Sequence, residues 1–229
     1  MSTPLHNAIK NGHYDACALL LDHGAAIDDP LLLAAKCGHT HICKLLLEYG
    51  VSIDEEDRYG TALHYAAGDG HLDTCKYLIE QGLDVNHINK FDLIPLHDAA
   101  TEGHADVCKL LLDHGSDVDL SAENGYGRYI TPLLHVIQYC KDYNTCKVLL
   151  DANADVNLHD GWGQTPLVYA INEEDADLCR LLISYGAIGD DCGCQGNYSN
   201  DDLRDYIRSI GEDPSCIVDE WPDECSVDE

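Results

Sequence analysis

The feature that most constrains this chain is a unit of residue types that recurs along its 229 residues. The clearest copy, Ile94 to Gly115, reads IPLHDAATEGHADVCKLLLDHG, with Pro-Leu-His near its start, a central Gly-His pair and a leucine run before the final glycine. Cysteines in one slot mark six copies, at steps of 26, 32, 33, 38 and 33 residues: Cys17, Cys43, Cys75, Cys108, Cys146 and Cys179. Self-similarity at this period predicts an array of stacked repeats.

Each copy of the unit predicts two helices and a connecting finger. In the fourth copy, Pro95 suits the first turn of a helix that we expect from about Leu96 to Glu102. Gly103 ends it, and a second helix with one apolar face is predicted from Ala105 to Asp113. Glycine closes the second helix in five copies, and Asn153, which also tolerates positive φ, closes it in the other. The pattern therefore predicts an all-α fold class.

By these motifs the chain resembles the ankyrin-repeat family. The family's Thr-Pro-Leu-His and Gly-His motifs are matched by Thr3 to His6 and by Gly12-His13, and Thr61 to His64 carries a close variant. The family's finger pattern is complete from Ala154 to Leu167. The resemblance covers residues 3 to about 188 and implies a solenoid of paired antiparallel helices with β-hairpin fingers.

The repeat pattern also gives the expected organisation of the chain. The repeats are expected at about 1–28, 29–60, 61–93, 94–130, 131–163 and 164–188. Residues 189–210 are interpreted as a degenerate C-terminal cap with a short helix, because a solenoid must cover the apolar side of its last repeat. Residues 211–229 are predicted to form an acidic, disordered tail.

Three departures from the repeat pattern are expected to change local geometry. The junction from Ala25 to Pro30 is about seven residues short, so its finger should be truncated. The junction that follows Gly115 has about five extra residues, and most of them lie in its finger. Lys141-Asp142 and Glu174-Asp175 replace Gly-His in the last two repeats, so these turns lack glycine.

The charge of the chain limits the partners that we expect. A formal net charge of −29, from 42 acidic residues against 13 lysines and arginines, disfavours binding to nucleic acid and to anionic membrane surfaces. It favours a basic protein partner, because opposite charges steer encounter. No apolar run approaches the roughly 18–20 residues of a membrane span, and the N-terminal residues lack the layout of a signal peptide.

The twelve cysteines do not predict a disulfide framework. Six share one slot of a repeating helix, and neighbouring helix axes about 8–10 Å apart are too distant for bridged Cα atoms, which lie nearer 5.5 Å apart. We interpret the six as buried, reduced side chains. A reducing, cytoplasmic location is therefore expected, with the nucleus or delivery into a host cell as alternatives.

A metal or catalytic site is not expected. Four thiolates from Cys192, Cys194, Cys216 and Cys225 would satisfy a zinc ion, but a single close pair is a weak signal, and no cofactor is predicted. The resemblance implies that the Leu-His and Gly-His histidines hydrogen-bond within and between turns. No nucleophile, phosphate-binding or His-Glu-x-x-His motif is present, so enzyme activity is not expected.

Aromatic residues at the finger tips form the first candidate binding surface. Four aromatic residues lie four or five residues before a first-helix leucine: Tyr59, Phe91, Tyr129 and Trp162. We expect their rings to lie on successive fingers at steps of about 10 Å. Exposed aromatic residues are enriched in binding hot spots. An equally open alternative is that each ring folds over its own finger or the next and stabilises it. Tyr126 and Arg128 in the long finger extend this surface.

The concave helix surface forms the second candidate. Tyr65, Asp98 and Tyr169 occupy the variable position after the Leu-His slot, and Glu102 lies near the inner turn. Because tyrosine is stable at half-buried positions, a structural role for the two tyrosines stays open.

The sequence therefore predicts a monomeric, non-enzymatic scaffold or adaptor that binds a basic protein through its finger tips and concave helix face. One alternative is an acidic mimic or inhibitor that occupies a basic groove of a nucleic-acid-binding or other protein. Another is a targeting subunit of a ligase or phosphatase complex. A salt titration separates the mimic from an aromatic anchor, because attraction between exposed charges is screened by salt.

Overall fold

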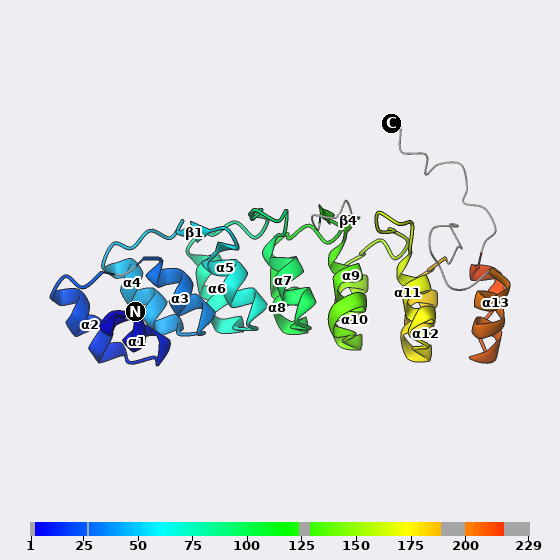
Figure 1. Cartoon of the computed structure of the whole chain (residues 1–229), viewed down its shortest axis with the longest axis horizontal. Helices are drawn as coiled ribbons and strands as arrows, with labels where there is room; N and C mark the ends of the chain where they lie inside the picture. Colours follow the sequence, from blue (N-terminus) through cyan, green and yellow to red (C-terminus); the bar gives the residue numbers. More distant parts are fainter. Residues whose placement is uncertain (1–2, 27, 124–128, 189–199, 218–229) are drawn as a thin grey trace, which may run out of the picture. The chain divides into compact units, whose positions relative to one another are not determined.

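The computed structural model describes residues 3–26, 28–123, 129–188 and 200–217. The chain divides into two compact units, residues 1–118 and residues 119–229. Both units are built from pairs of short helices that stand side by side and are joined by extended fingers (Figure 1). The expected all-α solenoid of paired helices is confirmed.

In the first unit every repeat has a first helix of seven residues and a second helix of nine. The first helices are α1 (Pro4–Lys10), α3 (Pro30–Lys36), α5 (Ala62–Gly68) and α7 (Pro95–Thr101). The second helices are α2 (Tyr14–Asp22), α4 (Thr40–Glu48), α6 (Leu72–Glu80) and α8 (Ala105–Asp113). The predicted bounds of α8 agree with the structure, and α7 begins and ends one residue earlier than predicted.

Alanine pairs explain how the first helices pack in this unit. Six alanines of α3, α5 and α7 have no exposed surface: Ala34, Ala35, Ala66, Ala67, Ala99 and Ala100. Their small side chains let neighbouring first helices approach more closely than neighbouring second helices do. The first helices therefore form the inner layer of the stack, and the second helices form the outer layer.

The fingers join the second helix of one repeat to the first helix of the next. We name them by the helices they connect: the α4–α5 finger is residues 49–61, and the α6–α7 finger is residues 81–94. The α4–α5 finger contains the predicted hairpin, in which β1 (Glu56–Asp57) pairs antiparallel with β2 (Gly60–Thr61). This finger also bonds to the start of α3, which follows the short α2–α3 connection. The Glu55 carboxylate accepts a hydrogen bond from the Leu31 N–H at 3.0 Å.

The second unit continues the pattern with one irregular helix. Its elements are β3 (Ala122–Glu123), β4 (Tyr129–Ile130), α9 (Pro132–His135), the π-helix η1 (Val136–Cys140), α10 (Tyr143–Asp151), α11 (Pro166–Asn172), α12 (Ala176–Ser184), α13 (Asn200–Ser209) and the 3-10 helix η2 (Pro214–Cys216). β3 and β4 form a second antiparallel hairpin, in which Ala122 faces Ile130. The α10–α11 finger is residues 152–165.

The turns that lack glycine keep the backbone conformation of those that have it. Gly103 has φ of 77°, and the aligned residues Lys141 and Glu174 have φ of 54° and 55°. Asn153 likewise adopts positive φ, at 65°, as predicted for the residue that replaces the terminal glycine of the second helix. A left-handed residue is costly without glycine, so packing of the repeat must hold these side chains in place.

A helical cap covers the last repeat of the second unit. Leu203 and Ile207 of α13 are buried, which agrees with a helix that covers the apolar side of the last repeat. The Arg180 guanidinium donates to the Ile210 carbonyl at 3.0 Å, which ties α12 to the end of α13. The first residues of the expected tail include η2 and the buried Ile217, whose carbonyl accepts from Arg204 at 3.2 Å. Residues 218–229 lie outside the described residues.

Candidate functional site

Asx turns shape the tips of three fingers that carry predicted aromatic residues. These are the α4–α5, α6–α7 and α10–α11 fingers. The side chains of Asp57, Asn89 and Asp160 accept from the backbone N–H two residues later, at 2.8, 2.8 and 2.9 Å. The residues that donate these bonds are Tyr59, Phe91 and Trp162. Asp and Asn favour such turns because the side chain mimics a backbone acceptor. The turn therefore fixes where each ring leaves the finger.

The first two rings contact each other across neighbouring fingers. The ring centroids of Tyr59 and Phe91 lie 5.6 Å apart with an interplanar angle of 31°. The Arg58 guanidinium lies 5.3 Å from the Tyr59 centroid and 5.6 Å from the Phe91 centroid, within cation–π range of both. The expected spacing of about 10 Å is therefore wrong for this pair, because the side chains lean together across the gap between the fingers.

The two rings remain accessible despite this contact. Tyr59 is 51% exposed and Phe91 is 39% exposed. The packing thus combines the two roles that the sequence left open, since the rings support each other and still present aromatic surface to solvent. We call Arg58, Tyr59 and Phe91 the finger-tip cluster.

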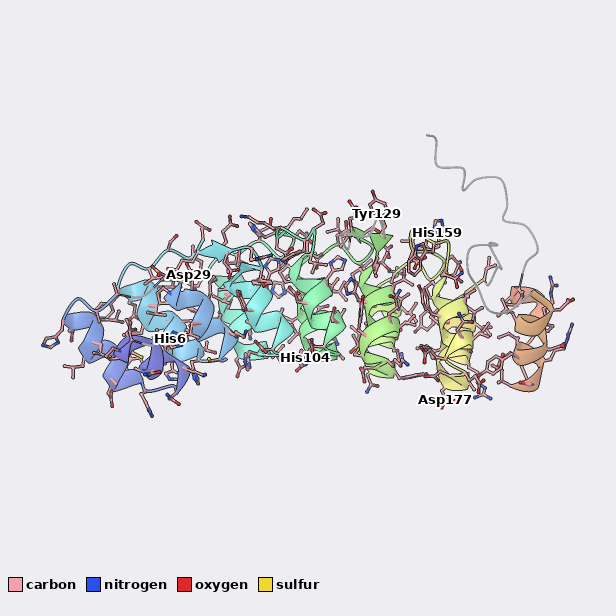
Figure 2. All side chains as sticks on the ribbon, in the orientation of Figure 1. His6, Asp29, His104, Tyr129, His159 and Asp177 are labelled. Atoms are coloured by element: carbon pink, nitrogen blue, oxygen red, sulfur yellow. The ribbon has the colours of Figure 1, made fainter. Side chains whose placement is uncertain are left out.

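The second unit carries its own exposed aromatic residues. Tyr129 of β4 is 54% exposed and Trp162 of the α10–α11 finger is 44% exposed. Figure 2 shows Tyr129 on the finger side of the helices, away from the short turns. Tyr126 and Arg128, which were predicted to extend this surface, lie outside the described residues.

A sequence signal at these tips was missed. Arg58 precedes Tyr59, Lys90 precedes Phe91 and Arg128 precedes Tyr129, whereas Gly161 precedes Trp162. The recurrence of a cation before the aromatic residue on three successive fingers is visible in the sequence alone. Its consequence for Arg58, contact with the rings of two fingers, requires the spatial structure.

Asparagine side chains connect neighbouring fingers in both units. The Asn86 amide donates to the Gly115 carbonyl at 2.9 Å and its oxygen accepts from the Asp117 N–H at 2.8 Å. Asn157 makes the same two bonds, to Gly186 and Ile188, at 3.3 and 2.7 Å. Two bonds from one side chain limit rotation of a finger relative to its neighbour, so the fingers form a supported surface.

Two tyrosines of the inner layer form hydrogen bonds to aspartates of the fingers. The Tyr65 hydroxyl donates to Asp57 at 2.7 Å, and the Tyr169 hydroxyl donates to Asp160 at 2.7 Å. The same aspartates form the Asx turns, so each joins a finger tip to an inner helix. Burial, followed by the neighbouring Asp57, raises the pKa of Tyr65. These contacts give both tyrosines a structural role at the positions where partner contact was predicted.

Asp98 occupies the same repeat position as Tyr65 but lies in a different environment. The finger residue that corresponds to Asp57 is Asn89, whose amide donates to the Tyr59 carbonyl at 2.8 Å. The Oδ2 atom of Asp98 is buried and has no hydrogen-bond partner among the described residues. Burial, with a smaller contribution from the exposed carboxylate of Glu102, raises the pKa of Asp98 to about 7. Two predicted site residues, Asp98 and Glu102, thus interact with each other.

The Leu-His histidines act within the stack. The His64 Nδ1 atom accepts from the Thr61 N–H at 3.2 Å, and Nε2 lies 3.2 Å from the Leu93 carbonyl of the next finger. Burial lowers the pKa of His64 to about 4. His97 repeats the first bond, with the Ile94 N–H as donor at 3.3 Å. These bonds cap the first helices and leave the rings inside the stack.

The cysteines of the repeat slot are core residues. All six are fully buried, and none of them forms a disulfide bond: Cys17, Cys43, Cys75, Cys108, Cys146 and Cys179. Burial raises the pKa of Cys43 and of Cys75 to about 12, so their thiols are protonated at neutral pH. Within the described parts of the chain, no group of three or more His, Cys, Asp or Glu side chains could hold a metal ion. Three of the four cysteines that were considered as zinc ligands, Cys192, Cys194 and Cys225, lie outside those parts.

No helix in the described ranges is both long enough and apolar enough to cross a membrane. The α-helices in these ranges have four to ten residues, far fewer than the roughly 20 residues that a span requires.

Comparison with known proteins agrees with this architecture. A family model described as ankyrin repeats (3 copies) matches residues 1–57, 31–122 and 133–201, and one described as ankyrin repeats (many copies) matches residues 96–150. An ankyrin and IPT/TIG repeat-containing protein of Schizosaccharomyces pombe is 40% identical over 78 residues. The match covers 34% of this chain and 6% of that protein.

Ankyrin repeats indicate a protein–protein interaction domain, which agrees with the supported fingers and with the exposed rings that they carry. The repeated helix pairs, the finger hairpins and the family-model matches over most of the sequence lead to one conclusion: the chain belongs to the ankyrin-repeat family.

Proposed function

We propose that this chain is a non-enzymatic scaffold or adaptor that binds a partner protein through its finger tips and its inner helix layer. The finger-tip cluster carries the proposal. Hot-spot residues are typically aromatic or arginine side chains with defined positions, and Arg58, Tyr59 and Phe91 combine both residue types on fingers fixed by Asx turns.

The inner layer supports a contribution from charge. Asp98 has a buried oxygen without a hydrogen-bond partner among the described residues, and Glu102 lies exposed beside it. A lysine or arginine from a partner could pair with the exposed Glu102 carboxylate, and its positive charge would also favour the charged form of Asp98. The net charge of −29 supports a basic surface on the partner. We further propose that the chain acts as a monomer in a reducing compartment.

The test removes the rings and measures partner recovery. The double variant Tyr59→Ala/Phe91→Ala should recover partner proteins at least about tenfold less efficiently in affinity purification with crosslinking mass spectrometry, because hot-spot truncations cost about 2 kcal/mol or more. Tyr143→Ala is the matched control, since Tyr143 is 45% exposed at the start of α10, away from the fingers. Equal recovery by both variants would contradict the proposed binding surface.

The net charge of −29 also favours a second candidate, an acidic mimic that occupies a basic groove. Its affinity should fall steeply with salt, because exposed charges separated by more than about 8 Å are screened at physiological ionic strength. Binding through the rings should tolerate salt. A salt titration of the recovered complex, with wild type and Tyr59→Ala/Phe91→Ala side by side, separates the two candidates.

A further inference from the structure

The α4–α5 and α6–α7 finger tips present cations on an otherwise acidic chain. The whole sequence has 13 lysines and arginines against 42 acidic residues. Arg58 and Lys90 nevertheless stand directly before the exposed rings of Tyr59 and Phe91, and both cationic side chains are exposed. The positive charge at these two finger tips is thus opposite in sign to the net charge of the chain.

Neither cation is neutralised within the described structure. Arg58 and Lys90 form no ion pair with any described carboxylate, although four acidic residues directly precede Arg58 and Asp92 lies two positions after Lys90. The contacts of Arg58 are the two rings of the finger-tip cluster. A guanidinium has five N–H donors in one plane, so stacking on rings is compatible with binding a carboxylate at its edge.

The adjacent carboxylates are engaged elsewhere. Asp57 accepts from the Tyr59 N–H through Oδ1 and from the Tyr65 hydroxyl through Oδ2. Glu56 lies 2.8 Å from the Nε2 atom of His87 on the next finger. Asp92 is exposed and follows Phe91 in the left-handed conformation. Local bonding thus diverts Asp57 and Glu56 from Arg58 and leaves Asp92 as a nearby negative charge that a ligand must tolerate.

We propose that the α4–α5 and α6–α7 finger tips bind an acidic, extended segment of the partner protein. Arg58 and Lys90 receive its carboxylates, and Tyr59 and Phe91 contact an apolar side chain beside them. The inference rests on the proposed function and assigns this part of the surface a ligand of the opposite charge to that expected from the whole chain. A partner with a basic surface for Asp98 and an acidic segment for the fingers fits both.

A protein segment fits this surface better than a nucleic acid does. Each phosphate of a nucleic acid carries a charge, so a strand long enough to span two fingers would meet the field of a chain with net charge −29. An acidic peptide needs only one or two carboxylates at the cations and can supply apolar atoms to the rings between them. Complementarity between the two cations and the carboxylates of the segment would therefore determine which segments bind.

A peptide selection on the intact chain tests the inference. A phage library of random peptides is selected against the wild type, and the enriched peptides are synthesised for affinity measurements. We expect enrichment of Asp or Glu beside an aromatic or aliphatic residue. Arg58→Gln should weaken these peptides about tenfold, since a hydrogen bond to a charged group contributes roughly 1.5–3 kcal/mol.

Matched variants separate charge from packing. Arg58→Lys keeps the charge but loses the planar guanidinium, so its affinity should lie between those of Arg58→Gln and wild type. Asp92→Asn should strengthen binding about twofold because one exposed charge is worth a few tenths of a kcal/mol. Asparagine tolerates the left-handed conformation of Asp92. Unchanged far-UV circular dichroism for each variant shows that the fold is retained.

The outcomes distinguish the two proposals. Selection of basic peptides, of peptides that bind Arg58→Gln as well as wild type, or of no peptides at all overturns the acidic-segment inference. If such basic or charge-insensitive peptides still lose binding to Tyr59→Ala/Phe91→Ala, the proposed binding function at the finger tips stands. If selected peptides bind that double variant normally, the finger tips are not the site and the proposed binding surface fails as well.

Discussion

The repeats of the first unit are coupled at their short turns by histidines, whereas those of the second unit are closed locally by aspartates. In the first unit His39, His71 and His104 each lie within 3.0–3.3 Å of a backbone carbonyl near the end of the preceding first helix. Figure 2 shows His104 at the end of the helices opposite the fingers. Each bond spans two repeats, so the turn of one repeat is anchored to the next.

The glycines of these turns complete the coupling. A Cβ at Gly70 would lie 2.6 Å from the His104 ring, and a Cβ at Gly38 would lie 2.5 Å from the His71 ring. Glycine therefore serves twice, because it permits positive φ and leaves space for the histidine of the following repeat. Gly-His is a pair whose two members act in different repeats.

The second unit replaces this arrangement with helix capping. Asp142 and Asp175 accept from the N–H groups of Thr145 and Leu178 at 2.7 and 3.0 Å, within their own repeats. An exposed ion pair between Lys141 and Glu173, at 2.6 Å, joins the two turns. Because exposed ion pairs contribute only about 0–1 kcal/mol, the coupling between repeats at the turns should be weaker here than in the first unit.

The largest expected loss of stability comes from placing a side chain at Gly70, in the space that the His104 ring occupies. Gly70→Ala should destabilise the chain by about 3 kcal/mol, because alanine at positive φ costs roughly 1–2 kcal/mol and the His104 ring must also move. Glu174→Gly is the opposite change in the second unit and should stabilise by about 0.5–1 kcal/mol through relief of its left-handed conformation. Urea unfolding followed by circular dichroism measures both, and equal effects of one sign would refute the comparison.

The next effect concerns the aspartate caps. Asp142→Ala should cost about 2 kcal/mol, because it removes a cap and also leaves the fully buried Thr145 hydroxyl without its acceptor. Asp175→Ala should cost about 1 kcal/mol, the typical value for a cap alone. Hydrogen exchange should show faster opening of α10 in the first variant and of α12 in the second. A loss that spreads into the first unit would argue against local capping.

The sequence predicted the repeat pattern, the bounds of α8 and the positive φ of Asn153 because these depend on residues that are near each other in the chain. It could not predict the contact between Tyr59 and Phe91, since side chains 32 positions apart lean together across two fingers. Tyr65 was selected as a contact residue from its position alone. Its bond to Asp57 could not be predicted in this way, because the bond depends on how the finger folds over the inner helix.

A smaller effect tests a feature that the two units share, the bond from an inner-layer tyrosine to a finger aspartate. Tyr169→Phe should cost about 1–2 kcal/mol, because Asp160 is fully buried and loses one donor. Tyr65→Phe should cost about 0.5–1 kcal/mol, because the half-buried Asp57 can bind water instead. The ratio of the two losses in urea unfolding is the measurement, and a larger loss at Tyr65 would contradict the burial argument.

A pH-dependent effect separates Asp98 from the uncharged residues at the same repeat position in the second unit, Val136 and Tyr169. The pKa of Asp98 is raised to about 7 in the folded chain, against about 4 for an unfolded aspartate. The folded state therefore binds this proton more tightly, and the stability associated with it is lost as pH rises from about 4 through about 7. Asp98→Asn should consequently match the stability of wild type near pH 4 and exceed it near pH 8 by up to about 4 kcal/mol, since each pKa unit corresponds to about 1.4 kcal/mol.

Glu102→Gln provides the matched control for this pH dependence, because the Glu102 charge is the second cause of the raised pKa. It should reduce the difference between acidic and alkaline conditions without abolishing it, whereas Val136→Ala in the second unit should lower stability by the same amount at both pH values. If Asp98→Asn and wild type instead keep a constant difference across the range, Asp98 does not change its charge on folding. The Asp98 carboxylate would then be ionised in the folded chain above about pH 4, as it is in the unfolded chain, and burial would not determine its charge.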